Sequence, residues 1–137
     1  MTGGGGPTGS VGALEVTVRD GSRRLRAMVV EVGDDVVVAV GGGERPHVGC
    51  VVAAVPSVRR DGSGFDASVS LLTILPHKEE PIARAVAEAV CTGLGRVAVV
   101  TAGVHEDGLD RAGIDTYLRL GRELAAAVVE RLCRAPG

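Results

Sequence analysis

A chain of 137 residues, of which 45% are hydrophobic and 23% charged, is long enough for one hydrophobic core, and its composition excludes wholesale disorder and a coiled coil. A formal net charge of -2 and an aromatic content of 1% exclude the basic field and the base-stacking platforms of nucleic-acid-binding proteins. The apolar runs are of strand length, so we expect no membrane-spanning segment.

The first ten residues differ in composition from the rest of the chain. Residues 1–10 are rich in Gly, Pro, Thr and Ser and lack hydrophobic periodicity, which predicts a flexible leader before a single α/β domain at residues 11–135. The leader does not resemble a secretion signal, so we expect a cytoplasmic protein. The cysteines are odd in number, widely spaced and set among apolar residues, which predicts buried, reduced thiols at Cys50, Cys91 and Cys133.

The next part of the chain has the pattern of β-strands. Apolar and polar residues alternate over residues 11–20, and an Asp-Gly turn leads into a second run at 25–32. A third run at 36–40 is rich in β-branched residues. After a glycine-rich break come two further runs, at 47–55 and 67–75. The pattern therefore predicts five antiparallel strands.

The period changes beyond residue 80. Apolar residues at helical spacing predict a helix from Pro81 to about residue 93, and the continuous apolar run at 96–102 predicts a buried, parallel strand. Asp110 is placed to cap a second helix with an apolar stripe on one side. The order βββββαβα predicts an α/β (α+β) fold, a two-layer sandwich of one mixed, mainly antiparallel sheet with helices on one face.

Three loops meet at one edge of this predicted sheet, and each carries one of the three histidines, His47, His77 and His105. Three imidazoles are a plausible first set of ligands for zinc or another divalent metal. Oxygen ligands are available nearby, at Glu79, Glu106, Asp107 and Asp110. A loop-capping or surface role is the commoner fate of a single histidine, so the metal remains one of two interpretations. The turn at residues 19–24 lies at the same edge, but the strand order needed to place it is open.

The glycine triplet at residues 41–43 has two interpretations. It allows backbone amides to approach a phosphate, with Lys78 or Arg45 supplying charge, or it is a flexible hairpin. The chain carries neither a nucleotide P-loop motif nor the dinucleotide-binding glycine motif. Lys78, the only lysine, precedes a helix N-terminus, where it is either a phosphate ligand or a solvated side chain. No serine or cysteine has the setting of a catalytic nucleophile.

Three short segments carry a family resemblance: Gly-Glu-Arg-Pro-His-Val-Gly at 43–49, Pro-His-Lys-Glu at 76–79 and Ala-Gly-Val-His-Glu-Asp at 102–107. In order and spacing they resemble the D subunits of gallate and hydroxybenzoate decarboxylases, also called LpdD-like prenylated-flavin chaperones. The resemblance covers about residues 11–133. Glu106 and Gly108 depart from the residues expected after the third histidine.

The resemblance implies a non-catalytic accessory protein that binds prenylated FMN and assists maturation of a UbiD-type decarboxylase. From the residues themselves, the first strand, if it is an edge, and the aliphatic surface of the second helix are the candidate surfaces for a homodimer or for docking a decarboxylase. Tyr117 would be the one aromatic side chain available to cover the flavin ring. The cofactor-binding residues would be Gly43, Arg45, Lys78, Glu79 and Asp107, and the metal ligands His47, His77 and His105.

Two other classes of function fit the same residues. A small metal-dependent hydrolase or lyase would use the three histidines with Glu79 or Asp107 as general base. A purely structural regulatory subunit would use none of them. The residues alone do not separate a binding module from the hydrolase, because three histidines beside carboxylates serve both.

Overall fold

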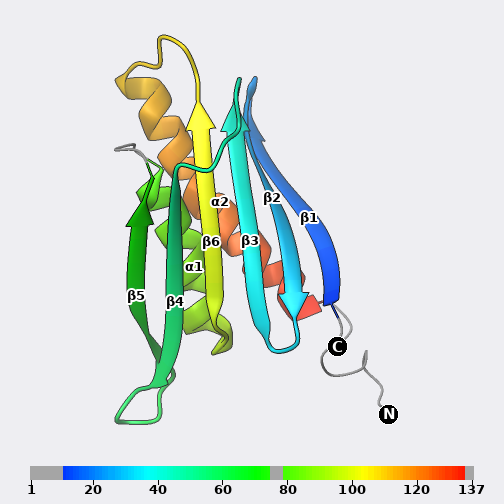
Figure 1. The fold of residues 1–137 in the computed structure, drawn as a ribbon, viewed down its shortest axis with the longest axis vertical. Helices are drawn as coiled ribbons and strands as arrows, with labels where there is room; N and C mark the ends of the chain where they lie inside the picture. Colours follow the sequence, from blue (N-terminus) through cyan, green and yellow to red (C-terminus); the bar gives the residue numbers. More distant parts are fainter. Residues whose placement is uncertain (1–10, 75–78, 135–137) are drawn as a thin grey trace.

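The computed structural model describes residues 11–74 and 79–134, which form one six-stranded sheet and two helices (Figure 1). The predicted leader at residues 1–10 lies outside the described residues, as does residue 135. The strands are β1 (Val11–Asp20), β2 (Arg23–Val32), β3 (Asp35–Gly43), β4 (Cys50–Val58), β5 (Phe65–Thr73) and β6 (Ala98–His105), and the helices are α1 (Glu80–Leu94) and α2 (Arg111–Arg134).

The last strand is inserted into the middle of the sheet. The strand order is β1-β2-β3-β6-β4-β5, with β6 parallel to β3 and antiparallel to β4. The five predicted strands alternate in direction as expected, but β3 and β4 are not neighbours because β6 lies between them. The predicted direction of β6 is confirmed, so the C-terminal ends of β1, β3, β5 and β6 share one edge.

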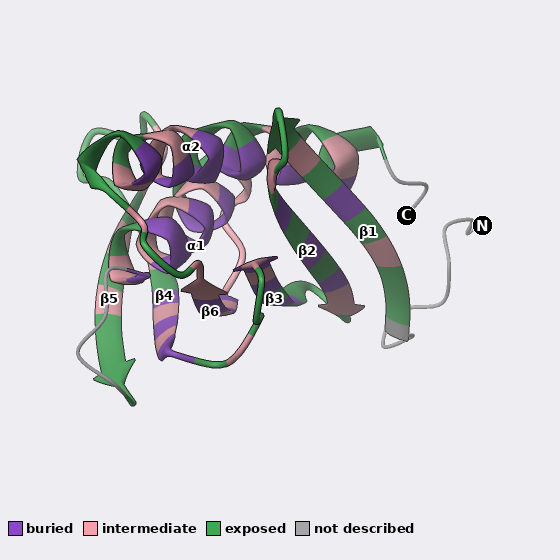
Figure 2. Ribbon diagram, turned by 90° about the horizontal axis from the view of Figure 1, so that it is seen from above, coloured by how far each residue is buried: buried purple, intermediate pink, exposed green. Residues whose placement is uncertain are grey.

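Both helices cover the same face of the sheet, which confirms the predicted two-layer sandwich. The α1 helix packs on β4, β5 and β6, whereas α2 packs on β1, β2 and α1. Figure 2 shows the two helices on one side of the sheet, and no described element covers the opposite side, which we call the open face. The core between the layers is aliphatic, with Val38, Val100 and Leu124 fully buried. Because both helices pack on one face of the sheet, the open face is available for a ligand or a partner.

The helix ends confirm the predicted capping. Pro81 lies in the first turn of α1, where its missing N–H costs no hydrogen bond, and Gly95 ends the helix at a positive φ of 64°. Asp110 caps α2, since its Oδ1 accepts a hydrogen bond of 2.8 Å from the backbone N–H of Gly113. None of the described helices has the length and apolar character needed to cross a membrane.

Two strands extend further than predicted. Residues 41–43 are the last three of β3 and not a loop, and β6 continues to His105. The physical reason is the parallel ladder between them, which pairs Gly41 with Gly103 and Gly43 with His105. Backbone hydrogen bonds to a neighbour hold glycine in a strand that its propensity disfavours.

The cysteines are free, but they are not alike. Cys50 and Cys91 are buried, and burial raises the pKa of both thiols. Cys133 is exposed, so the prediction that it is buried is wrong. It follows Leu132, a buried residue of the α2 stripe, and one step along a helix turns the side chain about 100° away from its neighbour.

Candidate functional site

The connection from β3 to β4, residues 44–49, crosses over β6 on the open face, and we call it the strap (Figure 2). The crossing is forced by the strand order, because β6 lies between β3 and β4. It needs glycine beneath it: a Cβ at Gly103 would overlap the carbonyl of His47, and one at Gly41 would lie 2.9 Å from Cβ of Pro46. The paired glycines of β3 and β6 therefore let the strap lie directly on the sheet.

The strap brings Arg45 to His105 and Asp107, as the site prediction requires. Nη2 of Arg45 lies 2.6 Å from Nε2 of His105 and donates a hydrogen bond of 3.2 Å to Oδ1 of Asp107. His105 Nε2 lies 2.8 Å from the same carboxylate oxygen. The contact with His105 and the charge of Arg45 hold the pKa of Asp107 below its usual range. These three side chains form one exposed polar cluster.

A second cluster joins the strap to the start of α1. His47 Nε2 lies 3.0 Å from Oε2 of Glu79, whose side chain is only 4% exposed. Glu79 is the N-cap residue of α1, so its carboxylate lies where the helix dipole favours negative charge. Gly49 leaves the space for it, since a Cβ there would overlap Glu79 Oε2. An imidazole beside a buried carboxylate can hold a proton or bind a cation.

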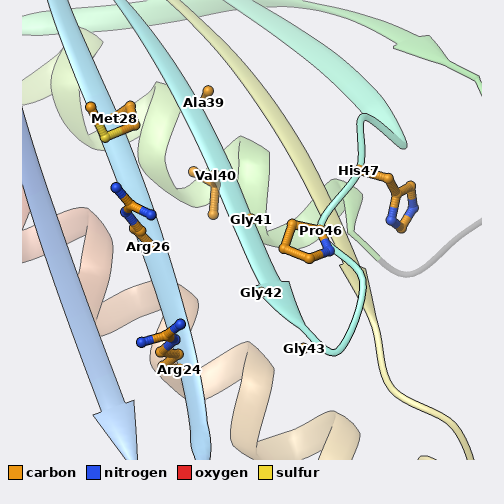
Figure 3. Close-up of a pocket in the computed structure, with 10 residues that line it drawn as sticks. All are labelled: Arg24, Arg26, Met28, Ala39, Val40, Gly41, Gly42, Gly43, Pro46 and His47. Carbon is orange, nitrogen blue, oxygen red and sulfur yellow. The ribbon is translucent and has the colours of Figure 1, made fainter.

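A cavity of about 420 Å³ opens on the open face beside the strap (Figure 3). Its walls are Arg24, Arg26 and Met28 on one side and Pro46 on the other, as Figure 3 shows, with β3 between them. The lining is completed by Ala39, Val40, Gly41, Gly42, Gly43 and His47. Arg24, the last residue of the turn at 19–24 whose place the sequence left open, thus lines the cavity. Arg24, Arg26 and Met28 were not among the predicted site residues, although their alternation with apolar residues and the prediction of helices on one face could have placed them on the uncovered face.

Two residues considered for the site are used elsewhere. Glu106 accepts hydrogen bonds of 3.1 and 2.8 Å from Arg23 and one of 2.8 Å from the hydroxyl of Tyr117. Tyr117 is buried in the helical layer and does not line the open-face cavity. Burial, with the bond to Glu106, raises the pKa of Tyr117 to about 12. Asp110 is also used elsewhere, because its carboxylate caps α2.

The predicted three-histidine metal site lies only partly within the described residues. His77 and Lys78 lie outside the described residues. Residues 11–74 and 79–134 contain no group of three or more His, Cys, Asp or Glu side chains that could hold a metal ion. Of the donors in this part of the chain, His47 and Glu79 fit a divalent cation, whereas the guanidinium beside His105 Nε2 opposes one there.

Comparison with known proteins relates the fold and the site to one family. No curated protein matches the chain. The family model for the prenylated flavin chaperone LpdD-like domain matches residues 19–133, from the end of β1 to the end of α2. This range contains the strap, both polar clusters and the cavity. It also confirms the resemblance seen in the three short segments, and the chain belongs to the family of LpdD-like prenylated flavin chaperones.

Proposed function

We propose that this protein binds prenylated FMN beside the strap and supplies it to a UbiD-type decarboxylase, with no turnover of its own. The observation that carries the proposal is the family match over residues 19–133, which includes every wall of the open-face cavity. A cavity of about 420 Å³ falls in the size range of small-molecule and cofactor sites, roughly 300–1,000 Å³.

The polar residues at the strap are suited to holding a flavin by its edges. Gly43 lines the cavity, whereas Arg45, on the strap that forms one of its walls, and Asp107 and Glu79, which contact that strap, do not line it. Lys78, next to Glu79 in the sequence, is a further candidate for the phosphate. We propose Gly43, Arg45, Lys78, Glu79 and Asp107 as the cofactor-binding residues.

Release matters as much as binding for a chaperone. A catalytic site gains from excluding water, but a carrier must let its partner reach the bound molecule. The cavity lies on a sheet face with exposed aliphatic side chains, including Val37, Val55 and Leu72. We propose that the decarboxylase docks on this open face, so that the cofactor passes directly between the proteins.

Of the two surfaces predicted to bind a partner, β1 and the aliphatic surface of α2, only β1 is exposed as expected. The aliphatic stripe of α2 is buried, with Leu120, Leu124 and Val128 in the core, so the prediction that it is a docking surface is wrong. The strand β1 is an edge of the sheet, as required, and one of its backbone carbonyls, that of Glu15, accepts a hydrogen bond of 3.3 Å from Arg131. Pairing of two β1 strands is our proposal for the homodimer.

Co-expression tests the proposed function. A decarboxylase produced with a flavin prenyltransferase should contain more bound cofactor and have higher activity when this protein is present. The isolated protein should show no decarboxylation, because it would only carry the cofactor. Omission without effect on either measurement would contradict the proposal. Hydrolysis of a substrate by the isolated protein, dependent on metal and on His105, would replace it with the enzyme interpretation.

The divalent metal is a separate part of the proposal, and we expect it to depend most on His47. Imidazole nitrogen and carboxylate oxygen are both zinc donors, and the His47–Glu79 pair presents one of each. His47→Ala should weaken zinc binding by about tenfold or more, and His105→Ala by less, since Arg45 competes there. Isothermal titration and elemental analysis measure both effects. Absence of stoichiometric metal in the wild-type protein would remove the metal from the function.

A further inference from the structure

Three arginines line the open face of the β1–β2 hairpin. Arg19 lies directly opposite Arg24 in the antiparallel register, and Arg26 lies two residues further along β2. Directly opposed residues project from the same face of a sheet, where like charges destabilise the pair. The hairpin therefore carries concentrated positive charge beside the cavity.

Only one of these arginines is neutralised by a neighbour. Nε of Arg26 lies 2.6 Å from Oε2 of Glu15 on β1. Within residues 11–74 and 79–134, neither Arg19 nor Arg24 forms a side-chain hydrogen bond or an ion pair. Both are exposed, and Arg24 lines the cavity. Of the charge that is left without a counter-charge, that of Arg24 lies at the cavity wall and that of Arg19 lies opposite it on β1.

The neighbouring part of the open face is apolar. Two residues beyond Arg26, a row of paired residues crosses the sheet from β2 to β4. Its members, in order, are Met28, Ala39, Thr101 and Val51. The next row on the same face, two residues further along each strand, consists of Val30, Val37, Val99 and Ala53. A ligand lying along β2 and β3 would therefore meet cations at the hairpin end and a smooth aliphatic surface beyond.

The strap closes the other side of this surface. Figure 3 shows Arg24, Arg26 and Met28 along β2, and Pro46 on the strap across β3 from them. Between these walls the floor is the methyl group of Ala39 and the part of the Gly41 backbone that Pro46 does not cover. A flat group can lie on such a floor without displacing a side chain.

We propose that the cavity binds a ligand with a phosphate group and a flat apolar body, with Arg24 and Arg19 holding the phosphate and the Met28–Ala39 surface supporting the body. The identity of the ligand as prenylated FMN rests on the proposed function. A guanidinium presents two parallel N–H donors to phosphate, and the phosphate dianion also relieves the repulsion between Arg19 and Arg24. Arg23, although adjacent, is unsuitable because Glu106 occupies its donors.

A comparison of FMN with riboflavin tests this assignment, since the two molecules differ only in the phosphate. Titration followed by flavin fluorescence should give an affinity of the wild-type protein for FMN about tenfold or more above that for riboflavin. Arg24→Gln should lower the affinity for FMN about tenfold and leave that for riboflavin unchanged. Arg24→Lys should restore part of the loss, because charge returns without the paired donors.

Arg60→Gln is the matched control, because it makes the same change in net charge on the β4–β5 connection, away from the cavity. It should leave both affinities at the wild-type value. Equal binding of FMN and riboflavin by the wild-type protein, or an unchanged FMN affinity in Arg24→Gln, would overturn the assignment. So would loss of the FMN preference in Lys78→Ala with its retention in Arg24→Gln.

The same variants separate this inference from the proposed function. If Arg24→Gln binds flavin normally while co-expression still raises decarboxylase activity, the phosphate position is wrong and the chaperone function stands. If Arg24→Gln loses the FMN preference while wild-type co-expression has no effect on the decarboxylase, the binding site stands and the chaperone function fails.

Discussion

Gly103→Ala should dislodge the strap, lower the free energy of unfolding by about 3 kcal/mol, at the upper end of overpacking costs, and abolish flavin binding. The added Cβ would overlap the carbonyl of His47, and it would meet backbone, which cannot rotate away as the end of a side chain can. The strap must lift from β6, and Pro46 and His47 move with it. The cavity then loses one wall.

Chemical denaturation and the FMN titration measure the two effects, and Gly12→Ala is the matched control. Gly12 also lies in a strand, but a Cβ built there has nothing within 4 Å. That variant should be as stable as the wild-type protein and should bind FMN normally. A Gly103→Ala variant with wild-type stability and affinity would show that the strap does not rest on β6 as described.

The sequence predicted the elements well because their signals are local. Alternating residues in β1 and β2, the helical spacing after Pro81 and the Asp110 cap each depend on neighbours within a few positions. The fold class followed from the order of these elements. The common edge for His47 and His105 also followed, because strand direction reverses at each tight turn and the crossover fixes the direction of β6.

The position of β6 had no local signal. Its insertion between β3 and β4 is decided by packing of α1 on β4, β5 and β6, a contact between segments far apart in the sequence. The strap and its glycines are consequences of that insertion. The glycine triplet at residues 41–43 therefore predicts a phosphate loop or a flexible hairpin when only the sequence is known, whereas these residues belong to a strand beneath a crossing chain.

The hydrogen-bond and ion-pair partners of individual charged side chains could not all be predicted from the sequence either. Arg45, His105 and Asp107 were predicted to share a site, and their side chains are in contact with one another. Glu106 is adjacent to Asp107 in the sequence, yet it turns to Arg23 and Tyr117 on the opposite side of β6 from the strap cluster. Neighbouring residues at a strand end face opposite ways, so the choice between them needed the three-dimensional arrangement.

Tyr117→Phe should lower the free energy of unfolding at neutral pH by about 1.5–3 kcal/mol, the usual contribution of a hydrogen bond to a charged group. The hydroxyl of Tyr117 donates to Glu106, which also accepts from Arg23. This network ties the β1–β2 hairpin to the segment between β6 and α2. It therefore fixes the hairpin that carries Arg24 at the cavity.

The network also predicts how stability depends on pH. The pKa of Tyr117 is raised from 10.0 to about 12, so its contribution is complete below pH 10 and is lost as the pH rises through about 12. Bonds from Arg23 and Tyr117 lower the pKa of Glu106 from 4.5, so its contribution is complete above that pH and is lost as the pH falls through the lowered value. Stability should therefore decline on both sides of a broad plateau.

Urea denaturation across the pH range separates the two contributions. Tyr117→Phe should remove the part of the alkaline decline that begins near pH 10, because no phenol remains to ionise at this position. Glu106→Gln should lower stability on the plateau and flatten the acid decline, since no carboxylate remains there to be protonated. Thr116→Val, which removes a neighbouring α2 hydroxyl bonded only to the carbonyl of Ala112, should change stability by less than about 0.5 kcal/mol and keep both declines. If Tyr117→Phe retains the full alkaline decline, ionisation of this phenol does not cause the decline, and the hairpin is held instead by the ion pairs of Arg23 with Glu106 and of Arg119 with Asp20.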